Sequence, residues 1–142
     1  MVAKKSILVT LGLGLLAGLV AIPLVRTPEK VLLSGEFHSV AHKGAGQARI
    51  VSTAGGQNLL KIVNLKTYPG SMLQVCLVAA PDAEDNDTVL ASGHVCLGPW
   101  LGAKTGLGVY PVPAALDLNR YRAVSIWQPE YRVNFTTAPL AP

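Results

Sequence analysis

Charged residues are scarce in this chain: they make up 14% of its 142 residues, whereas 50% of the residues are hydrophobic. That composition excludes an intrinsically disordered chain, because disorder requires low hydrophobicity and abundant charge. The length is enough for one domain and too short for two ordinary ones. The 14 glycines and 10 prolines fit a loop-rich β protein better than a helical bundle.

A strong positive field is also missing from most of the chain. Lys4, Lys5, Arg26 and Lys30 lie near the N-terminus, where only Glu29 opposes them. From there on, basic and acidic residues nearly balance, so the net charge of +4 belongs mostly to the N-terminus. A nearly neutral body is poorly suited to a polyanion, and we expect no nucleic-acid partner.

Sequence signatures of catalysis are lacking as well. We find no G-x-S-x-G nucleophile elbow, no paired-carboxylate signature and no C-x-x-C motif. The glycines at 12 and 14 lie inside an apolar stretch and cradle no phosphate. We therefore predict that the protein is not an enzyme and has no cofactor or metal of its own.

The N-terminus carries a long uncharged stretch, from Ser6 to Val25, preceded by Lys4 and Lys5. As a helix, twenty such residues would span about 30 Å, the thickness of the hydrocarbon core of a bilayer. We predict that residues 1–25 form a signal anchor with one transmembrane helix, because no A-x-A-type cleavage site follows. A cleaved secretory signal is the alternative. The positive-inside rule keeps the two lysines in the cytoplasm, and both interpretations export the body.

A short linker, residues 26–32, leads into a body that spans residues 33–142. We expect a single-pass protein of the cell membrane, with this body on the extracytoplasmic side, periplasmic or extracellular. In the body, short apolar runs alternate with turn residues, which indicates an all-β, antiparallel β-sandwich of about eight short strands. The predicted strands are 31–38, 48–53, 59–65, 73–79, 89–97, 107–112, 123–127 and 131–135.

Several short motifs follow one another in a specific order along the body. The most specific is Leu97-Gly98-Pro99-Trp100-Leu101-Gly102, followed later by Ile126-Trp127. Gly35-Glu36-Phe37, His42 and Leu73-Gln74-Val75-Cys76-Leu77 precede it. In this order the motifs, which cover nearly the whole body, resemble the DM-thirteen (DM13) family of extracytoplasmic domains, often labelled electron-transfer domains. The resemblance implies a β-sandwich with a redox role.

One position departs from that family. Its members usually carry a cysteine after the Ile-Trp pair, and the proposed redox role rests on that cysteine. Here Gln128 follows Trp127, and Pro129 comes next. A glutamine is neither a nucleophile nor a soft metal ligand, and it does not cycle between oxidation states. We therefore expect the fold of the family without the chemistry of that cysteine.

Cys76 and Cys96 are the only cysteines in the chain. Each lies between two apolar neighbours in a predicted strand, so both sulfurs should point to the face opposite the core. In an exported body we predict a structural disulfide between them. A redox-active dithiol is one alternative. A metal site that includes His94 is another, although it would need further ligands.

Two histidines flank the first predicted turn. We expect His42, which matches a family position, to hydrogen-bond the turn, and His38 to end a strand near the surface. Binding of a ligand or haem by His42 is the alternative. Residues 82–87 concentrate acidic side chains. We expect a solvated hairpin loop there, with a calcium site as the alternative, since the spacing does not match an EF-hand.

These features favour a non-catalytic binding or interaction module, held at the membrane, whose partner is an unidentified protein or small molecule. The alternative is a redox or electron-transfer protein that uses Cys76 and Cys96 or a histidine-bound cofactor. Candidate residues for such ligand or redox contacts are His42, His94 and Gln128. A third possibility, a calcium-dependent adhesion module, would use the acidic segment.

Overall fold

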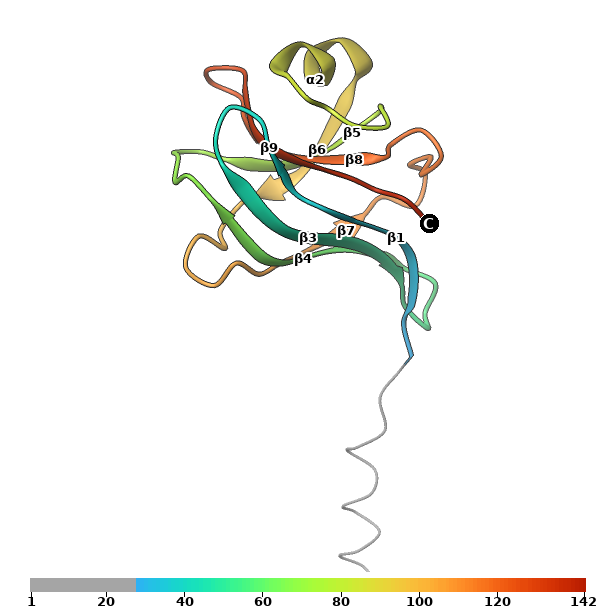
Figure 1. Ribbon diagram of the computed structural model, residues 1–142. Coiled ribbons are helices and arrows are strands. Elements are labelled where there is room, and N and C mark those ends of the chain that lie inside the picture. The colour runs from blue at the N-terminus through green and yellow to red at the C-terminus, as the bar shows by residue number, and fades with distance from the viewer. Residues whose placement is uncertain (1–27) are drawn as a thin grey trace, which may run out of the picture.

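The computed structural model describes residues 28–142, which form nine β-strands and one short α-helix (Figure 1). The predicted signal anchor, residues 1–25, lies outside the described residues. Between Pro28 and Pro142, no helix has the length and apolar character needed to cross a membrane. The strands make two antiparallel sheets. The predicted all-β class of the body is therefore confirmed.

Sheet A has four strands in the order β1-β3-β4-β7, each antiparallel to its neighbours. The first three form a meander, in which the Thr53 hydroxyl accepts a hydrogen bond from the Gln57 amide at 3.2 Å and closes the turn between β3 and β4. The bounds of the strands are Lys30–Glu36 for β1, Gly44–Ser52 for β3, Asn58–Thr67 for β4 and Gly108–Val112 for β7.

Sheet B has five strands in the order β2-β9-β8-β5-β6, also antiparallel. Along one side, Ala141 exchanges two backbone hydrogen bonds with Ser34 of β1. On the other side, the Tyr110 hydroxyl of β7 donates to the Pro99 carbonyl of β6 at 2.9 Å. The two sheets are thus tied together at both sides. The bounds are His38–Ser39 for β2, Gln74–Val78 for β5, His94–Pro99 for β6, Ala123–Gln128 for β8 and Val133–Pro139 for β9.

The main core lies between the sheets, where apolar side chains at alternate strand positions meet. Val75 and Leu77 of β5 and Val124 and Ile126 of β8 enter it from sheet B, as their alternation predicts. Burying a side chain of this size contributes about 1.5–3 kcal/mol to folding. Sheet A contributes Leu33, Ala48, Ile50, Leu60, Ile62, Leu65 and Val112.

Sheet B is also buried on its outer face, because the connection between β5 and β6 folds over it. Cys76, Val78 and Trp127 form a second apolar cluster there, and Val89 of helix α2 (Asn86–Ser92) packs on it. Figure 1 shows α2 over the strands of sheet B, on the side away from sheet A. As a result every residue of β8 is buried.

Asn134 of β9 joins the covering connection to the sheet through a buried polar network. Its Oδ1 accepts hydrogen bonds from the hydroxyls of Ser125 and Thr137, at 2.7 and 3.0 Å. Its Nδ2 donates to the Thr137 hydroxyl and to the carbonyls of Ala83 and Asp85. The side chain is fully buried, and it satisfies polar groups on both the sheet and the connection.

The predicted strand over 89–97 is wrong in its first half, because residues 89–92 belong to α2. The Asp85 carboxylate accepts a hydrogen bond from the Thr88 amide at 2.7 Å and caps the helix. Val89 then anchors the helix on the outer cluster. A short apolar run does not distinguish a strand from a buried helical turn. The expected hairpin loop over 82–87 is also wrong, because these residues lead into the helix and the last two belong to it.

Other strand boundaries differ from the prediction by a few residues. The first predicted strand is divided at Phe37, whose side chain turns into the core. β9 begins at Val133 instead of at residue 131, because Arg132 adopts a positive φ of 55° in the preceding turn. Within residues 28–142 the sandwich therefore has nine strands, against the eight expected.

Candidate functional site

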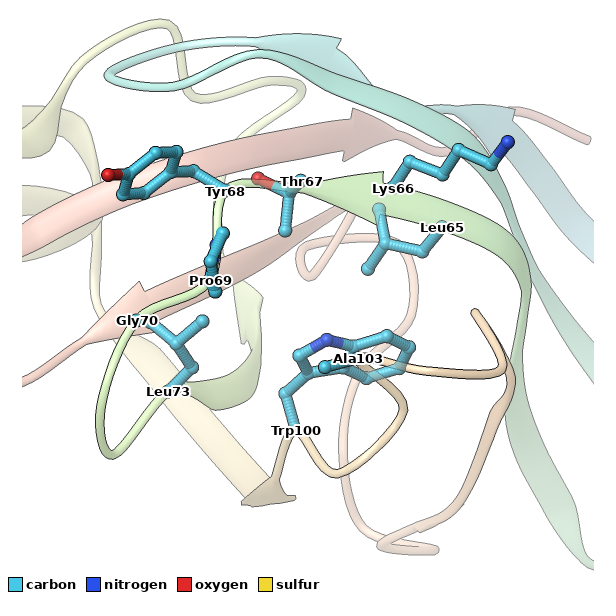
Figure 2. Close-up of a pocket in the computed structure, with 9 residues that line it drawn as sticks. All are labelled: Leu65, Lys66, Thr67, Tyr68, Pro69, Gly70, Leu73, Trp100 and Ala103. Atoms are coloured by element: carbon cyan, nitrogen blue, oxygen red, sulfur yellow. The ribbon is translucent and has the colours of Figure 1, made fainter.

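A pocket of about 340 Å³ opens at one end of the sandwich, between the end of β4 and the segment that follows β6 (Figure 2). Its volume lies in the range of small-molecule sites, and its lining consists mainly of apolar and aromatic side chains. The lining residues are Leu65, Lys66, Thr67, Tyr68, Pro69, Gly70, Leu73, Trp100 and Ala103.

Trp100 forms one wall of this pocket and is only 8% exposed. Its amide donates to the Leu73 carbonyl at 2.8 Å, which fixes the Trp100 segment beside the loop that precedes β5. Gly102 and Gly108 lie against the indole ring so closely that a Cβ on either would collide with it. The glycines around Trp100 therefore make room for the ring. In Figure 2 the indole nitrogen lies on the ring edge that faces the pocket.

An aromatic cluster stands beside the pocket, at the same end of the sandwich. The His42 ring stacks on the Tyr68 ring, with centroids 4.8 Å apart and planes 11° apart. It also packs against Phe135 of β9, at 4.3 Å. His42 does hydrogen-bond the turn, but through its backbone: its carbonyl accepts from the Val40 amide, and its amide donates to the Phe135 carbonyl, while the ring makes the aromatic contacts.

Lysines are the charged side chains that line this end of the molecule. Lys66, Thr67 and Tyr68 line the pocket and also a second hollow of about 450 Å³, which Lys43 and His42 border as well. Neither lining includes an aspartate or a glutamate. In the described part of the chain, neither lysine takes part in an ion pair. The mouths of both hollows are therefore electropositive.

Thr67 has the one unpartnered buried side-chain polar atom between residues 28 and 142, its hydroxyl oxygen. Figure 2 shows its methyl group directed towards Trp100 and its hydroxyl turned towards the Tyr68 side. A buried hydroxyl without a partner costs about 1–3 kcal/mol. Most buried polar groups in proteins have a partner, so this hydroxyl is one that a ligand or a water molecule could satisfy.

The two cysteines form a disulfide across β5 and β6, where they are register partners. Both predictions for them are confirmed: the bond is present, and Cys76 points away from the main core into the outer cluster. The two ends of the bond differ in exposure, since Cys76 is fully buried and Cys96 is exposed. The disulfide thus joins a buried residue to an exposed one.

A family model described as Electron transfer DM13 matches residues 36–140. The chain belongs to the DM13 family. The matched region includes the pocket, the aromatic cluster around His42 and both cysteines. The resemblance inferred from the ordered motifs is therefore confirmed. Comparisons with curated proteins and with solved structures find no match.

Gln128, at the position where the resemblance to the family implied a cysteine, lies next to the pocket loop. It is 8% exposed at the end of β8, and its Nε2 donates to the Ser71 carbonyl at 3.0 Å. Ser71 belongs to the loop between Gly70 and Leu73, two residues that line the pocket. The glutamine therefore tethers a wall of the pocket to sheet B, a role that the sequence alone did not indicate.

His94 and the two cysteines lie away from His42. His94 lies beside the outer cluster, where its Nδ1 is 3.1 Å from the Val89 carbonyl oxygen and its ring centroid is 5.6 Å from that of Trp127. In residues 28–142, no group of three His, Cys, Asp or Glu side chains is placed to bind a metal ion. The candidates thus divide between the pocket end, with His42 and Gln128, and the disulfide side, with His94.

His38 forms an ion pair that connects β2 to the segment before α2. Its Nε2 lies 2.7 Å from Asp82 Oδ1, and its Nδ1 lies 3.1 Å from the Ser39 carbonyl. Burial lowers the pKa of His38. The hydrogen bonds to Asp82 and Ser39 and the charges of Asp82 and Glu84 raise it by more than burial lowers it. The net effect is a pKa above the usual value of 6.5.

This pair makes the stability of the DM13 domain pH-dependent. A raised pKa means that the stabilisation is fully present below about pH 6.5 and is lost as the pH rises through the folded-state pKa. Because the side chains are 34% and 31% exposed, the loss should stay below about 1 kcal/mol. We expect the urea midpoint to fall between pH 6 and pH 8.5. In His38→Gln the part of this fall that comes from the ion pair should be missing. A fall as large as in the wild type would contradict the role of His38.

Proposed function

We propose that this DM13 domain is a non-catalytic binding module that takes a small, largely apolar molecule into the pocket beside Trp100. The observation that carries the proposal is the pocket itself, about 340 Å³ in volume, whose lining is mainly apolar and aromatic and includes one indole. The indole N–H edge offers a polar contact that fixes the orientation of a ligand, as in other small-molecule sites. No catalytic step is part of this role.

The cellular placement is part of the same proposal. The uncharged stretch from Ser6 to Val25, after Lys4 and Lys5, supports a single-pass anchor. The surface-exposed end of a disulfide supports an oxidising compartment outside the cytoplasm. The binding module would thus sample small molecules on the extracytoplasmic side.

The proposal is tested by titrating the full chain with 2-naphthoate and 2-naphthamide, two flat probes of the same shape. The chain has two tryptophans, so a ¹H–¹⁵N spectrum contains two indole N–H signals. We expect at least one probe to shift the Trp100 signal and to leave the Trp127 signal unmoved, because Trp127 lies in the outer cluster. Trp100→Phe assigns the signals by deleting one of them.

Filling the pocket provides the control. Ala103 is an exposed residue that lines the pocket, and Ala103→Phe should abolish the shift without unfolding the domain. Ala114→Phe places the same ring at an exposed position away from this pocket and should bind both probes like the wild type. A Trp100 signal that neither probe moves, or full binding by Ala103→Phe, would refute the pocket as a binding site.

Electron transfer, named in the description of the family, is a second candidate function. One observation favours it: Cys96 is exposed, while its partner Cys76 lies in the cluster that contains Trp127. A thiolate of a reducing partner could attack the exposed sulfur and form a mixed disulfide, releasing the Cys76 thiolate. A midpoint potential of about −120 to −200 mV, the range of exchange catalysts, would favour this function.

A further inference from the structure

We propose that the ligand of the pocket is an organic carboxylate with a flat apolar body, such as an aryl carboxylate. This inference rests on the binding function proposed above and adds the charge and shape of the ligand. Three properties of the site support this inference: the hydrogen-bond donors around the pocket, the charge at its mouth and the rings along its wall.

Every polar side chain that lines the pocket can donate a hydrogen bond, and two of the four can only donate. Lys66 offers three donors and no acceptor, and the Trp100 indole offers one donor and no acceptor. The hydroxyls of Thr67 and Tyr68 are also able to donate. A ligand that complements these groups must bring acceptor oxygens. A carboxylate brings two oxygens with about four lone-pair sites.

The charge at the mouth has one sign. Lys66 lines the pocket and the adjoining hollow, Lys43 lines that hollow, and no carboxylate lines either of them. Figure 2 shows the Lys66 ammonium extended away from Trp100 on the outer side of β4. Its flexible four-carbon stem allows it to turn towards the mouth. An anionic group at the mouth would therefore meet positive charge while remaining partly solvated.

The wall favours a flat body over a bulky one. The Trp100 ring, Pro69 and Leu73 surround the space, and the stacked rings of His42 and Tyr68 stand beside it. Planar rings gain additional attraction from offset or edge contacts with aromatic side chains. An aryl group inside, with its carboxylate at the lysines, satisfies both the apolar interior and the electropositive mouth.

The test compares the affinities of 2-naphthoate and 2-naphthamide for the full chain by calorimetry. We expect the carboxylate to bind at least about tenfold more tightly than the neutral amide, because the charge-assisted contacts are lost in the amide. Lys66→Met should weaken the binding of 2-naphthoate about fivefold and leave the affinity for 2-naphthamide unchanged. Lys43→Met with Lys66→Met should bring the two probes to similar affinity. Raising the NaCl concentration from about 0.05 to about 0.5 M should weaken the binding of 2-naphthoate and leave that of 2-naphthamide unchanged.

Lys30→Met is the matched control. Lys30 pairs with Ser52 on sheet A, at the end opposite the Thr67 terminus of β4. This variant loses the same charge and should bind both probes like the wild type. Equal affinity for the two probes would overturn the carboxylate inference and leave the binding function standing. A carboxylate preference that survives both lysine substitutions would overturn the electropositive mouth as the cause of the preference. If neither probe binds, the proposed function fails together with the inference.

Discussion

Asn134→Ala should lower the free energy of unfolding by about 3 kcal/mol, because it removes the centre of a buried network. The hydroxyls of Ser125 and Thr137 would lose their shared acceptor, and the carbonyls of Ala83 and Asp85 would lose a donor. Each buried group left without a partner costs about 1–3 kcal/mol, reduced where water reaches it. Urea unfolding of the full chain, followed by circular dichroism, measures the change.

Asn119→Ala is the matched control for this variant. Asn119 is exposed in the turn before β8, and only its backbone amide is hydrogen-bonded, to Asp117. Its substitution should change stability by less than about 0.5 kcal/mol. A loss below about 1 kcal/mol in Asn134→Ala would mean that the connection carrying α2 is held to sheet B mainly by its apolar contacts, by the His38–Asp82 pair and by the Asn86 side chain, which accepts from the backbone amide of residue 134.

Removing the disulfide should have an effect of similar size. The bond joins Cys76 to Cys96, 20 positions apart in the sequence. Without it the unfolded chain gains conformational entropy, which lowers the free energy of unfolding by about 3 kcal/mol. We expect lowered urea midpoints both in Cys76→Ala with Cys96→Ala and in the wild-type protein under reductant. The extra loss from the buried Cys76 side chain should make the double variant slightly the less stable of the two.

The same experiment distinguishes a structural bond from an electron carrier. A structural bond should have a midpoint below about −300 mV in a redox-buffer series. Reduction that leaves stability unchanged, with a midpoint near those of exchange catalysts, would contradict the structural role. The electron-transfer candidate would then become the leading function, with Cys96 as the residue that a partner attacks.

The sandwich could be predicted from the sequence because the alternation that marks each strand involves residues close together in the sequence. Alternation in β5 and β8 places Val75, Leu77, Val124 and Ile126 in the core, and the position of Cys76 between two core residues places its sulfur on the outer face. Helix α2 escaped prediction, because seven residues carry too little periodicity to compete with a strand pattern.

The candidate site was much less predictable. Trp100 could be taken for a core anchor, and it does pack in the main core, but it also walls a pocket. Tyr68 and Lys66 belong to no motif, and they line the same pocket as Trp100 only because β4 ends beside the segment after β6. The bond from Gln128 to Ser71 spans 57 residues of sequence. Only the folded topology joins such positions.

The register of sheet A has a consequence for the origin of the ligand. β4 starts at Asn58, which pairs with Ser52 opposite the start of β1, and ends at Thr67 by the pocket. Its ten residues place about 30 Å between those points. The pocket therefore lies at the end of the domain away from Lys30. If the proposed anchor holds the chain upstream of Lys30, a ligand would reach the pocket more directly from solution than from the bilayer.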